Sequence, residues 1–332
     1  MPLMDSASWK KFLEATEPNH HLLQTAEWGD LKCQFGWSAT RLVAGQFGAQ
    51  ILFKPLPFGF SVAYVPKVST RNFAQMQTGE LGKLIEEECR KQRAVFIKVE
   101  LDCWDDEYQL PLLGYTLSQH AIQPLRTITV DISAQVEEIL ARMKQKCRYN
   151  IRLAEKKDVF VVEHNTMDAF YELMQETGGR DGFEVHTREY YQKGLDLFWP
   201  TGRVALLIAE VDGLPLAGLM VFCVGERSWY LYGASSDRER NRMPAYLLQW
   251  KAMLWAKEQG CRTYDLWGIP DEPEEKLERD FETRSDGLWG VYRFKRGFGG
   301  VVRRSFPAMD KPLIPLLYSL YKIRQRIRGI SF

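Results

Sequence analysis

The same series of strands and helices is expected twice along the chain, and this repetition restricts the possible folds more than any other feature. Residues 40–102 read as three strands, one long helix and a closing strand, and residues 204–267 read in the same order. In the second copy, Pro244 stands at the first position of the helix and Gly260 follows its end, as is typical of helix boundaries. The expected strands lie at 40–44, 50–55, 61–65 and 94–101 and at 204–211, 217–224, 229–233 and 261–267, with helices within 73–91 and over 244–259.

This order of elements predicts the α/β class. Strands that precede one long helix and a last strand favour a mixed sheet flanked by helices, and two copies favour a duplicated domain. A length of 332 residues suits two domains. A similar order also arises without duplication in α/β chains, so this alternative stays open.

The segment between the copies is expected to hold a strand at 127–131 and a single helix over about 133–157. Ser133 is a suitable N-cap for this helix, and apolar residues recur along it at helical intervals. Its other face is basic, which is typical of a solvated surface; contact with tRNA phosphates is the alternative and would make activity salt-dependent. Further helices are expected at 166–177 and 188–198, with a glycine-rich loop at 178–182.

Composition favours a globular protein that works in the cytoplasm. Hydrophobic residues make up 45% of the chain and the net charge is +1, so no overall basic field indicates a nucleic-acid partner. The six cysteines lack CxxC spacing and the five histidines show no metal-ligand spacing, so we expect reduced thiols, no metal and no cofactor. We expect neither a signal peptide nor an apolar run of the roughly 20 residues that span a bilayer.

Two segments in the second half carry most of the chemical information. Residues 242–250 read RMPAYLLQW, and residues 292–300 read YRFKRGFGG, which places Lys295 between aromatic residues just before a glycine-rich turn. Together they predict a cationic cleft that binds a phosphorylated acceptor and stabilises an oxyanion. The chain from residue 290 onward is strongly basic, and Asp310 is the only acidic residue there.

These segments resemble those of the Fem-type (FemABX) peptidoglycan aminoacyltransferases. The resemblance implies two tandem acetyltransferase-like (GNAT) domains at 1–140 and 141–305, with a basic C-terminal helix within 306–332 that returns to the first domain. Because the helix expected at 188–198 leads almost directly to residue 204, the chain resembles members that lack a helical-hairpin arm. The resemblance keeps its order over nearly the whole chain and rests on residues 27–32, 36–37, 143–152, 233–236, 243–250, 264–269 and 292–300.

The resemblance implies that the chain transfers an amino acid from aminoacyl-tRNA to the stem-peptide amino group of a UDP-linked or lipid-linked muropeptide. Attack of an amine on an ester creates a negatively charged tetrahedral oxygen, so the protein has to position the reactants and stabilise that charge. Lys295 is the catalytic candidate, because an ammonium is a compact point charge. Phe294 is a candidate to pack against the terminal adenosine of the donor or to shape the cleft. A surface lysine in a turn is the plainer reading of Lys295.

Three further residues are candidates for holding the acceptor. Lys32 and Arg242 would supply cations for a pyrophosphate, and Arg242 precedes a helix N-terminus, where backbone amides also favour anions. Tyr246 lies one turn into that helix and could hydrogen-bond to the same ligand. The plainer readings are a solvated loop arginine for Arg242 and core packing for Tyr246.

Two residues at strand ends complete the candidate site. Asp102 follows the last strand of the first copy, where open α/β sheets commonly bind ligands. Tyr264 lies in the matching strand of the second copy, and members of the resembled family use a tyrosine nearby. Structural roles are the alternative for both. The basic tail is expected to pack on the first domain, with contact to an anionic membrane as the minor alternative.

Two rival enzymes and one non-enzymatic role remain open. An acetyl-CoA-dependent N-acyltransferase would place a glycine-rich turn before the long helix, but residues 238–245 contain no glycine there. Transfer of an amino acid from tRNA to a protein N-terminus would suit the same fold. A binding module for RNA or wall precursors would bind without transfer. The sequence indicates neither the transferred amino acid nor the oligomeric state.

Overall fold

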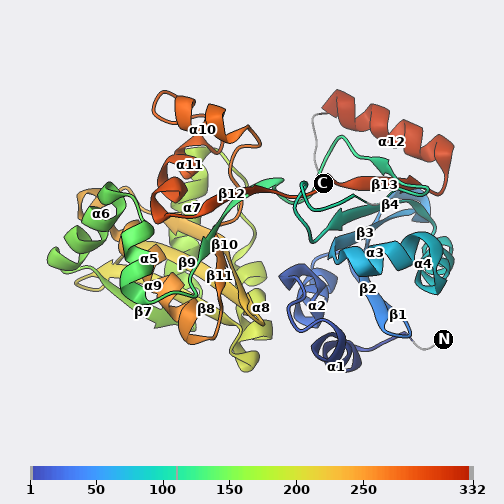
Figure 1. Cartoon of the computed structure of the whole chain (residues 1–332), viewed down its shortest axis with the longest axis horizontal. Helices are drawn as coiled ribbons and strands as arrows, with labels where there is room; N and C mark the ends of the chain where they lie inside the picture. The colour runs from blue at the N-terminus through green and yellow to red at the C-terminus, as the bar shows by residue number, and fades with distance from the viewer. Residues whose placement is uncertain (1–2, 110, 329–332) are drawn as a thin grey trace. The chain divides into compact units, whose positions relative to one another are not determined.

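The computed structural model of the chain describes residues 3–109 and 111–328. The chain forms two compact units (Figure 1): unit 1 comprises Met1–Leu125 with Arg304–Phe332, and unit 2 comprises Arg126–Arg303. Each unit is built on one sheet, and in each the first three strands of the repeated order pair antiparallel while the third pairs parallel with the fourth. The prediction of two like α/β halves is confirmed.

The sheet of unit 1 has the order β1-β2-β3-β4-β13-β5. Every residue of β3 and β4 is buried, as expected for strands covered on both faces. Helices α3 and α4 pack on the face that carries Ile51 and Val65, whereas the opposite face, which carries Gln50 and Val62, meets α2 and α12. The strands are β1 (Ser38–Ala44), β2 (Phe47–Pro55), β3 (Ser61–Val68), β4 (Ala94–Leu101), β5 (Thr116–Leu117) and β13 (Met309–Pro312).

The helix expected within 73–91 is two helices in the structure, because the chain turns at Gly79. That residue ends α3 in an extended conformation and starts α4. Gly82 lets the two helices approach, since a Cβ there would lie 2.2 Å from the backbone oxygen of Met76. The helices of this part are α1 (Ser6–Thr16), α2 (Ala26–Gln34), α3 (Thr70–Thr78) and α4 (Glu80–Lys91).

The sheet of unit 2 has the order β12-β6-β11-β10-β9-β8-β7. Residues along β8 alternate between two cores: Leu207 and Ala209 face α6 and α9, whereas the opposite face carries Gly218 of β9, packed against Phe170 of α7. The strands are β6 (Arg126–Asp131), β7 (Phe160–His164), β8 (Val204–Val211), β9 (Leu214–Val224), β10 (Arg227–Ser235), β11 (Thr263–Asp265) and β12 (Val301–Arg304).

The helices of unit 2 depart from the sequence-based expectation at two places. The single helix expected over 133–157 is broken at Met143 and Lys144, because the amide of Lys144 donates to the carbonyl oxygen of Gly297 at 2.9 Å instead of continuing the helix. Ser133 is not its N-cap; the side chain donates to Asp131. The loop expected at 178–182 continues helix α7 instead. The helices are α5 (Val136–Arg142), α6 (Gln145–Lys156), α7 (Asp168–Asp181), α8 (Arg188–Phe198), α9 (Pro244–Glu258), α10 (Glu274–Asp280) and α11 (Trp289–Lys295).

The segment 126–140, placed in the first domain by the sequence, packs in unit 2 because β6 pairs with β11. The C-terminal part of the chain returns to unit 1 in two steps. Strand β13 pairs antiparallel with β4, and α12 (Pro315–Arg328) then lies beside these strands (Figure 1). Tyr318 of α12 packs on Phe96 with ring centroids 5.1 Å apart, which confirms the prediction of a returning C-terminal helix. Among the residues described, no helix has the length and apolarity needed to cross a bilayer.

Candidate functional site

The parallel strand pair of each unit ends at a group of polar side chains. In unit 1, β3 and β4 run parallel and Asp102 directly follows β4. In unit 2, β10 and β11 run parallel, β11 ends at Asp265, and residues 266–268 follow it. Ligands of open α/β sheets commonly bind beyond the carboxyl ends of such strands. The two groups therefore occupy equivalent places in the two halves.

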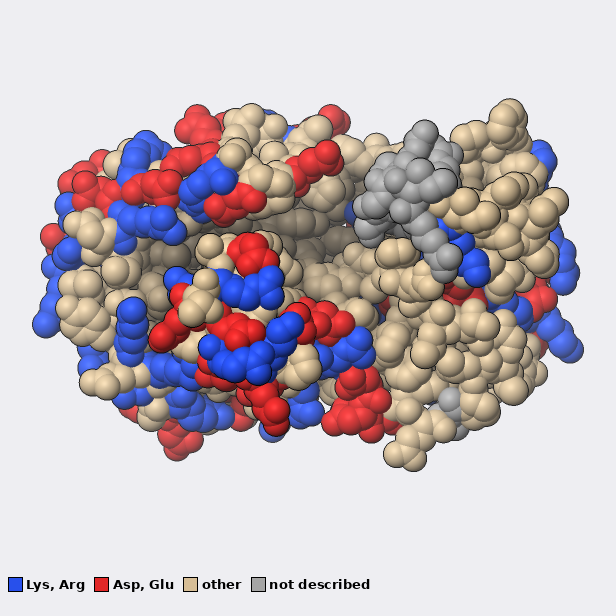
Figure 2. Space-filling model, turned by 90° about the horizontal axis from the view of Figure 1, so that it is seen from above, with Lys and Arg blue, Asp and Glu red and all other residues tan. Residues whose placement is uncertain are grey.

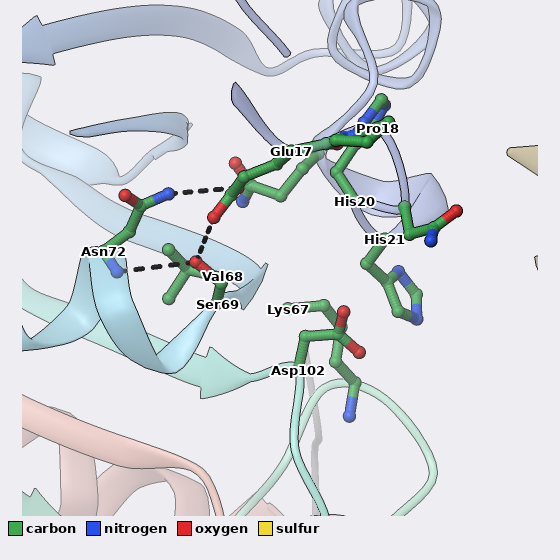
Figure 3. Close-up of a pocket in the computed structure, with 11 residues that line it drawn as sticks. Glu17, Pro18, His20, His21, Lys67, Val68, Ser69, Asn72 and Asp102 are labelled. Carbon is green, nitrogen blue, oxygen red and sulfur yellow. Dashed lines mark hydrogen bonds between the residues drawn. The ribbon is translucent and has the colours of Figure 1, made fainter. Parts of the chain in front are cut away.

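In unit 1 this place is a cavity of about 220 Å³. Figure 3 shows His21, Lys67 and Asp102 on one side of it and a network of Glu17, Ser69 and Asn72 on the other. Asp102, the acceptor contact expected from the sequence, is thus a lining residue. Lys32, the other candidate from this unit, is not a lining residue; its ammonium lies 4.9 Å from the Trp28 ring centroid on α2.

The network on the wall of the cavity is held around Glu17. Ser69 donates its hydroxyl proton to Oε1 of Glu17 at 2.5 Å, and Nδ2 of Asn72 donates to Oε2 at 3.1 Å. Burial raises the pKa of the Glu17 carboxyl, although these hydrogen bonds oppose the shift. The two hydrogen bonds therefore tie Glu17 to Ser69 and Asn72 in this wall.

Lys67 is a pocket residue that the sequence analysis missed. It lies in β3 with φ 44°, where the pairing of β3 with β4 is irregular between Val65 and Val68. Its ammonium donates to the hydroxyl of Ser305 at 2.9 Å. Pro66 within a strand signals such a bulge, because proline lacks the amide proton for the ladder. Pro66 is therefore the signal in the sequence that could have identified Lys67.

In unit 2 the corresponding place is occupied by Lys295, the catalytic candidate. Lys295 is the last residue of α11 and is only 5% exposed, which rules out the plainer reading of a surface lysine. Its Nζ donates to the carbonyl oxygens of Gly268 at 2.9 Å and Trp267 at 3.2 Å, and lies 5.4 Å from the Tyr230 ring centroid. An ammonium has three protons, so two carbonyls leave one donor to offer.

The carboxylate of Asp265 interacts electrostatically with the Lys295 ammonium. Its carboxylate accepts hydrogen bonds from the hydroxyl of Thr127 and from the amide of Trp267, the latter at 2.7 Å. Trp267 has φ 62°, a left-handed conformation that is strained for a tryptophan and that turns the chain after β11. The segment 265–268 thus curves around the lysine head group.

Burial governs the titration of both groups. It lowers the pKa of Lys295 to about 7, and the carboxylate of Asp265 partly opposes this shift. Burial likewise raises the pKa of Asp265, against the hydrogen bonds from Thr127 and Trp267. A buried ammonium with little compensating charge gains most when a negative charge develops beside it. The site is therefore suited to stabilising an oxyanion.

The structure brings Phe294 and Tyr246 together. Their ring centroids are 5.0 Å apart, and the Tyr246 ring also stacks on Phe298 at 5.9 Å. Burial raises the pKa of the Tyr246 hydroxyl. These rings form an aromatic cluster between α9 and the end of α11, and Phe294 directly precedes Lys295 in the chain.

The two other candidates of unit 2 have internal partners. Arg242 donates to Glu239 at 2.7 Å and to the carbonyl oxygen of Lys157 at 2.7 Å, which fastens the loop before α9 to the end of α6. Tyr264 is fully buried, and its hydroxyl accepts from Gln249. Burial raises the pKa of Tyr264 well above its ordinary value. Tyr264 therefore packs in the core and anchors β11, the strand in which Asp265 follows it.

No group of three or more histidine, cysteine, aspartate or glutamate residues within 3–109 and 111–328 is arranged to hold a metal ion. The outer face of α6 is basic: Lys146, Arg152 and Lys156 are exposed on it, and Tyr149 between them is 61% exposed. Cys147 and Ile151 on the inner face pack in the core.

Comparisons with known proteins agree with the fold. The chain is 25% identical to the lipid II:glycine glycyltransferase of Staphylococcus haemolyticus (strain JCSC1435) over 390 residues, covering 91% of this chain and 90% of that protein. It is also 25% identical to the enzyme of that name from Staphylococcus aureus (strain USA300) over 394 residues, covering 92% and 91%. Both alignments are longer than this chain of 332 residues, so the relatives carry insertions that it lacks.

Solved structures show the same architecture. FemX superposes with a TM-score of 0.84 at 23% identity over 96% of this chain and 99% of FemX. A tandem GNAT protein from the clavulanic acid biosynthesis pathway superposes with a TM-score of 0.51 at 12% identity over 93% and 94%. The tandem acetyltransferase-like fold expected from the sequence is confirmed. Since the model of the FemAB family matches residues 107–214 and 211–326, this chain belongs to the FemAB family.

Proposed function

We propose that this chain transfers an amino acid from aminoacyl-tRNA to the stem-peptide amino group of a lipid-linked muropeptide. The family assignment and the glycyltransferase relatives support aminoacyl transfer in interpeptide-bridge formation, and the acceptor in the relatives' name, lipid II, favours a lipid-linked acceptor over a UDP-linked one. The buried Lys295 at the carboxyl end of the β10–β11 pair is the observation that carries the chemistry.

In the proposed reaction, the neutral amine of the acceptor attacks the ester carbonyl of the donor. The carbonyl oxygen becomes negative in the tetrahedral intermediate, and the Lys295 ammonium donates its remaining proton in a hydrogen bond to it. Collapse forms the amide and breaks the ester bond to the ribose. The proton lost by the amine balances the one gained by the ribose oxygen.

The remaining residues have binding roles in this proposal. The cavity of unit 1, lined by Lys67 and Asp102, binds part of the acceptor, and the aromatic cluster of Tyr246 and Phe294 receives the terminal base of the donor. The exposed cations of α6 contact donor phosphates. Arg242 and Lys32 remain candidates for the acceptor pyrophosphate, and Tyr264 is assigned to support of β11.

The acetyl-CoA alternative is less well supported by the same observations. The turn before α9 contains Glu239 and Met243 with φ 48° and 58°, and bulky residues at these positions keep a pyrophosphate from the backbone amides. Calorimetry with acetyl-CoA tests this, and micromolar affinity would favour the alternative. Competition between a muropeptide and a peptide with a free N-terminus tests transfer to proteins.

A single-turnover assay tests the proposed function. Wild-type protein is incubated with a panel of charged tRNAs and with lipid-linked or UDP-linked muropeptide, and the products are read by mass. Lys295→Ala should lower the transfer rate by about 10²–10³-fold with acceptor binding retained, whereas Lys251→Ala, on the exposed side of α9, should not. Binding of both substrates without any transfer would indicate a binding module instead.

A further inference from the structure

Helix α12 is apolar on two faces, although only one of them is covered. Tyr318 and Tyr321 on the inner face pack on Phe96 of β4. On the outer face, Leu316, Leu320 and Ile323 are 73%, 55% and 53% exposed. Their spacing of four and three residues places them in one row. A helix normally buries its apolar residues, so the exposed outer row indicates a missing partner.

A turn of unit 1 adds a fourth large apolar side chain. Phe58 is 89% exposed in the turn Pro57–Gly59 and has φ 62°, an uncommon conformation for phenylalanine. The residues on either side of this turn, Leu56 and Phe60, belong to the same apolar cluster as Tyr318 of α12. The turn and the helix are therefore neighbours, and we call Phe58, Leu316, Leu320 and Ile323 the apolar platform.

The sequence of α12 is basic. No acidic residue occurs after Asp310, whereas Lys322, Arg324, Arg326 and Arg328 all belong to α12. Arg93 adds a guanidinium 4.4 Å from the Phe60 ring centroid. Figure 2 looks onto the side of unit 1 that carries α12: uncharged residues form a broad tan surface there, with blue and red side chains at its edges.

We propose that the apolar platform and the basic residues of α12 bind unit 1 to the surface of an anionic lipid bilayer. An amphipathic helix lies in the bilayer interface when apolar side chains reach the acyl boundary and basic ones meet anionic head groups. Contiguous apolar patches flanked by polar groups commonly mark such interaction sites. Leucine, isoleucine and phenylalanine fit acyl chains, and the basic sequence of α12 fits phospholipid anions.

A second copy of the chain fits this surface less well. In a two-fold symmetric dimer, the same patch meets itself, so the basic residues of one α12 would approach those of the other. Such like charges repel, and the sequence of α12 contains no acidic residue to offset them. An RNA partner would use the cations but would gain little from the leucine row.

Vesicle sedimentation tests the proposal without donor or acceptor, so its outcome is independent of the proposed function. Wild-type protein should bind vesicles of equal parts phosphatidylglycerol and phosphatidylcholine at least about tenfold more tightly than vesicles of phosphatidylcholine alone. Replacing the leucine row by serine (L316S/L320S/I323S) should weaken binding about tenfold or more, and Phe58→Ser should weaken it to a smaller extent. A matched control replaces three exposed apolar residues of unit 2 (F160S/V162S/L214S) and should bind as the wild type does.

Four results would overturn the proposal. The first is that the wild type does not bind anionic vesicles, and the second is that the leucine-row variant binds them as tightly as the wild type does. The third is that the control variant loses as much binding as the leucine-row variant. The fourth is that light scattering shows a dimer for the wild type and a monomer for the leucine-row variant. The last result would assign the platform to a second copy. Thermal unfolding of the variants checks that the fold is retained. If the triple variant is unfolded, Leu316→Ser alone replaces it. For this single variant we expect binding at least about threefold weaker, because it loses the transfer free energy of one apolar side chain.

Discussion

Lys98 and Asp310 form a buried ion pair across 212 residues of sequence, with Nζ and Oδ1 2.7 Å apart. Their side chains are 2% and 7% exposed. Lys98 also donates to the hydroxyl of Ser118 and the carbonyl oxygen of His120, and Asp310 accepts from the hydroxyl of Tyr318 at 2.9 Å. This network joins β4, β13 and α12, and so holds the returning segment in unit 1.

Removing one partner of this pair should be costly. In Asp310→Ala, the ammonium of Lys98 stays buried without its carboxylate, and we expect the free energy of unfolding to fall by about 3–5 kcal/mol. The double variant Lys98→Met/Asp310→Leu leaves no uncompensated charge and should lose much less. Urea unfolding followed by circular dichroism measures both. Equal losses in the single and double variants would show that the uncompensated charge of Lys98 is not the cause of the loss.

The sequence predicted the parts of the fold that depend on local pattern. Hydrophobic alternation and turn residues placed the strands of both copies, and Pro244 and Gly260 bounded α9 closely. It could not predict the break at Lys144, because that break depends on the carbonyl of Gly297, more than a hundred residues away. Strand β13 could not be predicted for the same reason, because its pairing with β4 is set by tertiary contacts.

The candidate site was predicted in part. The resemblance singled out Lys295, but its burial and its two carbonyl partners could not be read from a sequence in which it stands beside Arg293 and Arg296. Asp265 was passed over in favour of its neighbour Tyr264, because a strand alternates faces and the sequence does not reveal which face holds the site. The position of Lys67 depends on a bulge in β3, and Pro66 is the sequence signal for that bulge.

The burial of Lys295 should reduce stability at neutral pH. Its pKa is about 7 in the folded chain and 10.5 ordinarily, so between these values the unfolded chain binds more protons and stability from this group rises with pH. Lys295→Met removes the cost and should raise the free energy of unfolding at pH 7 by about 1–3 kcal/mol, although two carbonyls lose a donor. The gain should shrink as pH approaches 10. A gain that grows with pH would contradict the lowered pKa.

The same titration should limit catalysis. If the ammonium form stabilises the oxyanion, kcat/KM should fall as pH rises through about 7, once the profile is divided by that of Lys295→Ala to remove titration of the acceptor amine. Asp265→Asn removes the negative charge that supports the ammonium, so the fall should move to lower pH. A ratio that instead rises through pH 7 would make Lys295 a general base.

The cavity of unit 1 should affect acceptor binding and not the chemical step. Asp102→Asn and Lys67→Met change the charge of lining residues, and we expect each to raise KM for the muropeptide about tenfold with kcat nearly unchanged. Glu107→Gln, an exposed carboxylate close to Asp102 in sequence, is the matched control. If both lining variants lower kcat with KM unchanged, the cavity serves the reaction in some way other than acceptor binding.

The exposed face of α6 should bind the tRNA donor. Lys146, Arg152 and Lys156 share this face with Tyr149, an arrangement typical of surfaces that contact phosphates and stack on a base. Replacing the three cations by glutamate should raise KM for charged tRNA at least about tenfold and lower the slope of log KM against log salt by about two to three, because each lost phosphate contact removes about 0.7–0.9. Acceptor binding should be unaffected. If the slope is unchanged, the donor binds elsewhere and this face is only a solvated surface. The control carries the same reversal at three exposed cations of unit 1, namely Lys11, Lys83 and Lys91.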